Sequence, residues 1–259
     1  MRAVEYRRMG GSVRVAVLLG LLAGPAGADG ASDLAGRLQA LRSPGPVAAT
    51  LRLELRLERT LHRVTASGQA SVRLDVEQDE AGIHVRWPPA LLRDADAEER
   101  QRDESPDRLT PVREALRELD PARLAHLLDQ AGTLAGLTKD KPVEEAADGY
   151  AGREARRLVY RFRPRLSWTD AYYLRHSEGR FTVWIASDGT PLASESVASF
   201  EGKTSRMFGR FKGTTRISTR YAVESGRLRV AERDVDELDS HEDGGDVEHA
   251  NRRFVLERR

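Results

Sequence analysis

The residues of this chain that could do chemistry form few groups, and the most suggestive group is acidic. His241, Glu242 and Asp243 lie close in sequence to His249, and imidazole and carboxylate groups are common metal ligands. A metal site also needs ligands held in a fixed geometry, whereas this stretch contains two adjacent glycines and no hydrophobic frame. We therefore expect residues 234–246 to form a solvated acidic loop or tail, and we expect no metal.

Catalytic motifs are incomplete in the same way. Gly202-Lys203-Thr204-Ser205 is similar to the end of a phosphate-binding loop, but the first glycine of that motif falls on Val197. The chain has no cysteine, no Gly-x-Ser-x-Gly and no His-Glu-x-x-His, so it lacks thiol nucleophiles and the common hydrolase signatures. We expect neither a catalytic residue nor a cofactor, and a hydrolase of unrecognised type is the alternative left open.

Large apolar side chains carry the stronger functional signal. Tyr160 and Phe162 alternate with arginines on a predicted strand, and Leu124 and Leu127 lie on one stripe of a predicted helix. A well-filled core would use such residues in the same way, so the alternative to a binding cavity is ordinary packing. The predicted ligand-binding residues are Trp87, Tyr160, Phe162, Trp184, Leu124, Leu127 and Leu128.

The elements that position these side chains are mostly β-strands. Residues 51–58 alternate strictly between leucine and a charged residue, so as a strand they place four leucines on one face. The same alternation recurs along most of the chain, and Asp188-Gly189 and Ser225-Gly226 indicate hairpin turns. We expect one large antiparallel sheet with an apolar and a charged face. Its predicted strands span residues 47–59, 63–77, 82–87, 153–163, 179–187, 191–201, 204–223 and 227–233.

Helices are expected within an insertion at about residues 88–146. The apolar period there changes from two to about 3.6, which is typical of helices. Thr110-Pro111 and Asp120-Pro121 each place a capping side chain before a proline, a favoured helix start, while residues 91–102 predict a charged helix or a loose excursion. Together with the sheet, this insertion indicates an α+β fold in a single domain over residues 29–259.

An export signal precedes that domain. Residues 1–28 carry four arginines, then an apolar run over residues 15–23, then Ala26-Gly27-Ala28, which has the small-x-small form of a cleavage site. The apolar run is much shorter than the roughly 20 residues that span a bilayer. We therefore expect a signal peptide cleaved before Asp29 and a periplasmic protein.

The charge of the mature chain excludes one class of partner. Residues 1–28 hold four of the 42 basic and one of the 41 acidic residues, so residues 29–259 carry 38 basic and 40 acidic residues and a net charge of −2. Nucleic-acid-binding domains are strongly basic. We expect no nucleic-acid partner.

One segment resembles a known family. Residues 181–195, Phe-Thr-Val-Trp-Ile-Ala-Ser-Asp-Gly-Thr-Pro-Leu-Ala-Ser-Glu, resemble the central hairpin of the periplasmic lipoprotein-carrier superfamily (LolA/LolB-like), which typically reads Trp-Ile-Asp, a short turn with glycine, and a second strand. Ala186 stands where that family has Asp, and the acid is displaced to Asp188. The order of an export signal, a short first helix, three strands, a helical insertion and a long strand meander is also similar.

The resemblance implies a large curved antiparallel sheet, a half-open barrel, with the helical insertion as a lid on its concave face. It implies a role of the kind seen in outer-membrane lipoprotein sorting. We expect a non-enzymatic carrier that is monomeric and binds a lipid, a lipoprotein acyl chain or another apolar ligand. The alternative is a structural or interaction module of the cell envelope whose core is self-filled and whose charged insertion contacts an envelope protein.

Overall fold

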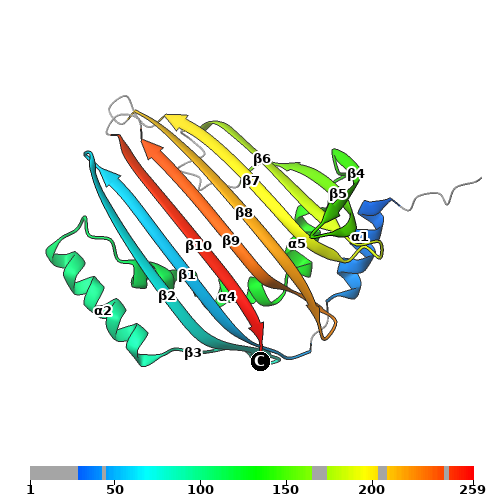
Figure 1. Cartoon of the computed structure of the whole chain (residues 1–259), viewed down its shortest axis with the longest axis horizontal. Helices are drawn as coiled ribbons and strands as arrows, with labels where there is room; N and C mark the ends of the chain where they lie inside the picture. Colours follow the sequence, from blue (N-terminus) through cyan, green and yellow to red (C-terminus); the bar gives the residue numbers. More distant parts are fainter. Residues whose placement is uncertain (1–28, 43–44, 165–173, 204–208, 242–244) are drawn as a thin grey trace, which may run out of the picture.

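The computed structural model describes residues 29–42, 45–164, 174–203, 209–241 and 245–259. In this part of the chain, ten antiparallel strands form one sheet in the order β3-β2-β1-β10-β9-β8-β7-β6-β5-β4, accompanied by five helices (Figure 1). The strands are β1 (Val47–Leu61), β2 (Val64–Asp79), β3 (Gly82–Arg86), β4 (Glu144–Tyr150), β5 (Arg153–Phe162), β6 (Leu174–Ile185), β7 (Pro191–Lys203), β8 (Arg210–Glu224), β9 (Arg227–His241) and β10 (Asp246–Arg258). The helices are α1 (Gly30–Ala40), α2 (Pro89–Glu104), α3 (Pro111–Glu118), α4 (Pro121–Leu128) and α5 (Ala131–Leu137).

The alternation in β1 separates the two faces of the sheet. Leu51, Leu53 and Leu55 are buried, whereas the intervening Arg52 and Glu54 are exposed, as expected when successive side chains of a strand point in opposite directions. We call the face with the leucines the helix face and the other the open face. Figure 1 shows α4 and α5 behind the strands, so the open face is nearest to the viewer.

The larger hydrophobic cluster, here the leucine cluster, covers one half of the helix face. Leu51, Leu53 and Leu55 of β1 pair in register with Leu256, Phe254 and Arg252 of β10 and with Leu74, Val72 and Ala70 of β2. Leucines of α4 and residues of α2 and α3 close over these strands, and Trp87, Ile83 and Val85 pack at its border. No polar side chain interrupts the β1 row of leucines. In aqueous solution this face is therefore stable only when other parts of the protein cover it.

The second cluster, here the aromatic cluster, lies over the opposite half. Tyr160 of β5 and Phe181 of β6 are cross-strand partners whose ring centroids lie 6.3 Å apart. Leu34 and Leu38 of α1 and Leu134 of α5 pack on these rings, and Phe162 and Tyr221 are partly buried against the same cluster. The two clusters are thus separate bodies of apolar side chains on one face of the sheet.

A β-bulge in β9 changes which residues face the helices. Tyr221 of β8 pairs with Val230, but the preceding Arg220 pairs with Glu232, so Ala231 is an extra residue on β9. Beyond it, the alternation is inverted: Arg233, not Glu232, follows Val230 on the helix face. The bulge therefore brings a charged side chain beneath the helices.

The expected α+β class with one large antiparallel sheet is confirmed, and the sheet is open, with β3 and β4 as its edges. The loop predicted for residues 234–246 is wrong over residues 234–241, because β9 continues to His241; residues 242–244 lie outside the described residues, and β10 begins at Asp246. Cross-strand backbone pairing sustains these strands without apolar alternation. Strand β4 was not predicted, because Glu144–Tyr150 lacks an apolar row. The predicted signal peptide lies outside the described residues.

In the described part of the chain, no helix has both the length and the apolar character required to cross a membrane.

Two tyrosines, Tyr160 and the partly buried Tyr221, give a matched test of the packing. Tyr160 is 2% exposed, and among the described residues its hydroxyl has no hydrogen-bond partner, whereas the hydroxyl of Tyr221 lies 2.6 Å from Ser194 Oγ. We expect Tyr160→Phe to leave the free energy of unfolding unchanged or to raise it by up to about 1 kcal/mol, and Tyr221→Phe to lower it by about 1 kcal/mol. Urea denaturation checks both values, and a larger loss in Tyr160→Phe than in Tyr221→Phe contradicts this packing.

The buried Tyr160 also predicts how the stability of the protein depends on pH. Burial, followed by the negative charges of Asp29 and Glu145, raises the pKa of Tyr160 to about 12. Because the unfolded chain ionises this tyrosine near pH 10, wild-type stability falls as pH rises from about 10 to 12. Tyr160→Phe removes this contribution, so its advantage over wild type should grow across that interval.

Candidate functional site

Helix α4 places three leucines against the sheet. The Asp120 carboxylate accepts a hydrogen bond of 2.8 Å from the Ala122 N–H, and Pro121 occupies the first helical position, so the helix starts where the sequence predicts. Leu124, Leu127 and Leu128 are then 1%, 4% and 1% exposed within the leucine cluster. The predicted lid residues therefore line an interior that the protein's own side chains fill.

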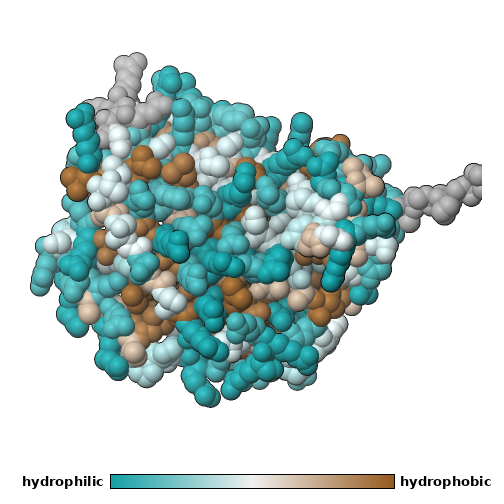
Figure 2. Space-filling model, in the orientation of Figure 1, coloured by the Kyte–Doolittle hydropathy of each residue, from teal (hydrophilic) through white to brown (hydrophobic). Residues whose placement is uncertain are grey.

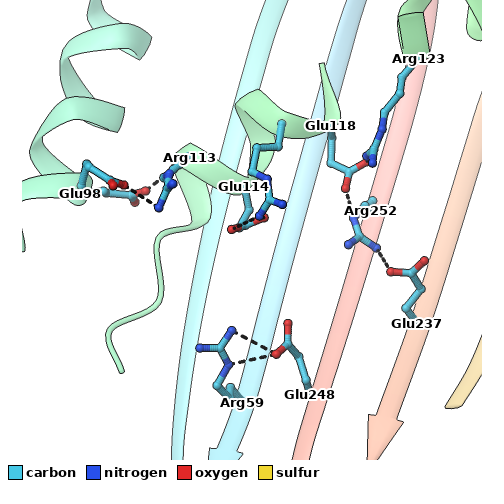
Figure 3. A network of polar contacts seen from close by, with 11 residues as sticks. Arg59, Glu98, Arg113, Glu114, Glu118, Arg123, Glu237, Glu248 and Arg252 are labelled. Atoms are coloured by element: carbon cyan, nitrogen blue, oxygen red, sulfur yellow. Dashed lines mark hydrogen bonds and ion pairs between the residues drawn. The ribbon is translucent and has the colours of Figure 1, made fainter. Parts of the chain in front are cut away.

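An ionic rim fastens α3 and α4 to the sheet beside this interior. Arg252 of β10 lies on the helix face, with Nε 3.0 Å from Glu118 Oε1 and Nη1 2.6 Å from Glu237 Oε2 (Figure 3). Glu118 also pairs with Arg123 of α4 at 2.6 Å. Arg252 and Glu118 side chains are each 17% exposed, so their attraction is only partly screened by water.

The same α3 helix is tied to α2. The Arg113 backbone N–H donates to Glu98 Oε2 at 3.0 Å, and the Arg113 guanidinium lies 2.6 Å from Glu99 (Figure 3). Farther along the sheet, Arg59 and Glu248 form a more exposed pair at 3.1 Å, drawn apart from the helices in Figure 3. Polar contacts thus hold the edges of the α3–α4 pair, and leucines fill the space beneath it.

The structure divides the predicted ligand-binding residues among three places. Leu124, Leu127, Leu128 and Trp87 belong to or border the leucine cluster, and Tyr160 and Phe162 belong to or border the aromatic cluster. Trp184 lies on the open face, because its neighbours Val183 and Ile185 take the helix face. Its indole Nε1 donates to Asp148 at 3.0 Å, and its ring centroid lies 5.7 Å from that of Tyr150.

Trp184 borders a hollow of about 1060 Å³ on the open face. Four arginines line it, and Glu144 pairs with two of them, at 2.5 Å from Arg157 and 3.6 Å from Arg180. Hydrogen bonds from the Gly149 N–H and from the indole of Trp184 lower the pKa of Asp148 nearby. Figure 2 shows hydrophilic residues interspersed with smaller hydrophobic areas over this face. Phe162 and three valines also line it, so the hollow brings together two predicted ligand-binding residues, Phe162 and Trp184, in a mixed polar and apolar lining.

Between the two apolar clusters runs a polar seam that the sequence did not reveal. It consists of Gln130, Ser194, Thr219, Tyr221 and Arg233. The Arg233 guanidinium donates from Nη2 to Gln130 Oε1 at 2.9 Å and from Nε to Thr219 Oγ1 at 3.2 Å. Simple alternation would place Arg233 on the open face, and the bulge at Ala231 that reverses this leaves no readable sequence signal.

Histidine and carboxylate groups form surface pairs in the described chain. His84 lies 3.1 Å from Asp79 and His249 lies 3.2 Å from Asp236, and each side chain is about half exposed. Among the described residues, no three His, Asp or Glu side chains converge in a way that could hold a metal ion.

The rim can be tested by mutation. Arg252→Gln leaves Glu118 and Glu237 without their shared cation, and we expect a loss of about 1–3 kcal/mol in the free energy of unfolding, with faster amide hydrogen exchange in residues 111–128. Arg59→Gln is the control, because it breaks an exposed pair and should cost under about 1 kcal/mol without changing that exchange. Equal exchange in both variants would show that Arg252 does not fasten the helices.

No protein-family model matches this chain, and neither a curated protein nor a solved structure is significantly similar to it. The resemblance to the periplasmic lipoprotein carriers therefore stays a prediction.

Proposed function

We propose that this chain is a non-enzymatic, exported periplasmic protein that binds a lipid, a lipoprotein acyl chain or another apolar ligand between α3–α4 and the sheet, which curves as a half-open barrel. One observation carries the proposal. The contact between α4 and the sheet is made of leucines, valines and Phe254, while its ion pairs lie at the rim. Such an interface can exchange one set of hydrocarbon contacts for another.

Magnitudes set the length of ligand that could displace α4. Removing Leu124, Leu127 and Leu128 from the interior gives up about 1.5–3 kcal/mol for each leucine, or about 4.5–9 kcal/mol together. Each buried methylene of a ligand returns about 0.8 kcal/mol. A chain of about 6–11 methylenes therefore offsets the loss, and only longer chains gain net affinity.

The proposed mechanism is solvent exclusion gated by the helices. Separation of Glu118 from Arg252 frees the edge of the α3–α4 pair, and α4 then gives its place in the leucine cluster to the ligand. When the ligand leaves, the leucines return and the interior closes on itself. Near balance between the two states suits a protein that must both take up and release its ligand.

A second candidate function follows from the same burial. An interior filled by its own leucines is what a structural or interaction module of the envelope requires. Helix α2 buries only Leu91 and Ala95, so its charged remainder is available to an envelope protein.

Chain length distinguishes the two functions. Protein that is exported by its own signal and purified from an envelope fraction should release lipid on solvent extraction. Native mass spectrometry of the same protein should detect the lipid bound to the intact chain. In calorimetry, hexadecanol should bind, whereas butanol, with fewer methylenes than the exchange requires, should bind at least tenfold more weakly. Absence of extracted lipid together with no binding of hexadecanol contradicts the carrier, and cross-linking of a defined protein through residues 91–107 then favours the interaction module.

A further inference from the structure

Arg233 is a guanidinium of the polar seam that lacks a carboxylate partner among the described residues. Its cross-strand neighbours are Thr219 on β8 and Phe254 on β10, and Phe254 belongs to the leucine cluster. Burial lowers the pKa of Arg233, and Tyr221 is the titratable group that acts against this. Arg233 is partly buried, and charges withdrawn from water are ordinarily paired, so its two neutral partners leave it able to accept an anion.

The partners of Arg233 occupy only part of its hydrogen-bonding capacity. It donates one bond from Nη2 to Gln130 and one from Nε to Thr219, both to neutral oxygens, whereas a guanidinium carries five N–H donors. The guanidinium fork matches two oxygens of a carboxylate or phosphate. The remaining donors therefore form an incomplete anion-binding group on the helix face.

Gln130 holds the position that an anion would take. It lies between α4 and α5, where its backbone N–H donates to Leu228 O at 2.8 Å and its side-chain amide N–H donates to His126 O. These contacts fix its carbonyl oxygen toward Arg233, and Gln130 is 1% exposed. Because only Asp129 separates Gln130 from α4, movement of α4 away from the sheet also removes this neutral oxygen from the guanidinium.

We propose that Arg233 is the receptor for the anionic headgroup of the ligand, a carboxylate or a phosphate, and that Gln130 occupies it in the ligand-free protein. This inference rests on the proposed function, since the headgroup enters when α4 yields to the apolar chain. A charged acceptor forms a bond roughly twice as strong as a neutral one. The exchange of Gln130 for an anion therefore favours the loaded state, while Phe254 beside Arg233 leads the chain into the leucine cluster.

The test compares ligands that share one chain and differ in headgroup. Binding of palmitate, hexadecyl phosphate and hexadecanol is measured by calorimetry for the wild-type protein and for Arg233→Gln. We expect wild type to bind at least one of the two anions tenfold or more tightly than hexadecanol. Arg233→Gln should lose this preference while keeping its affinity for hexadecanol. Preference for palmitate alone assigns the headgroup to carboxylates, and preference for hexadecyl phosphate alone assigns it to phosphates.

Two further variants keep the test decisive. Arg73→Gln is the matched control, because it removes an exposed arginine from the open face and should leave the preference unchanged. Arg233→Lys keeps the positive charge without the guanidinium fork, so it should retain a weakened preference for the anionic ligands. This variant replaces Arg233→Gln in the test if Arg233→Gln does not fold. Equal binding of all three ligands by wild type, or a preference that persists in Arg233→Gln, overturns the role of Arg233 and leaves the proposed function intact. Failure of all three ligands to bind overturns both.

Discussion

The apolar face of β1 is the constraint on which the rest of the structure depends. Four leucines in alternation, continued sideways by residues of β2 and β10, make a surface that water cannot wet favourably. Helices α2–α4 form a covering layer for it, and the eight-residue lengths of α3 and α4 suit that task better than independent stability. The same burial that stabilises the fold also sets the free energy that any ligand must replace.

Charged groups on the helix face determine where that covering layer is held on the sheet. Arg252 of β10 is the cross-strand partner of Leu55 on β1. From there its guanidinium pairs with Glu118 of α3 and fastens that helix to the sheet. The bulge at Ala231 places Arg233 on the same face, where its guanidinium donates to Gln130, between α4 and α5. The helices thus rest on hydrocarbon and are positioned by two arginines, one paired with carboxylates and the other with neutral oxygens.

Sequence reasoning reached the class of the fold because alternation is a local signal. Residues 51–58 predicted β1 and its buried leucines, and Asp120-Pro121 predicted the start of α4. The acidic stretch before His241 was read as solvated because its side chains carry no apolar row, although backbone pairing with β10 makes it a strand. Strand β4 was missed for the same reason.

The candidate site was less accessible to such reasoning. Leu124, Leu127 and Leu128 were expected together, and the structure places them together, yet Trp184 falls on the opposite face from Tyr160. Arg233 could not be chosen in advance, because one extra residue in β9 decides which way it points. Long-range register, and not residue type, carries that information.

Movement of α4 on ligand binding is the central claim, and a distance measurement tests it directly. The chain has no cysteine, so spin labels at Ala122→Cys on α4 and Glu54→Cys on the open face of β1 would be the two labelled sites. With saturating hexadecanol, this movement predicts that the distance between these labels lengthens relative to the ligand-free protein, as α4 leaves the leucine cluster. An unchanged distance distribution with hexadecanol bound would contradict it.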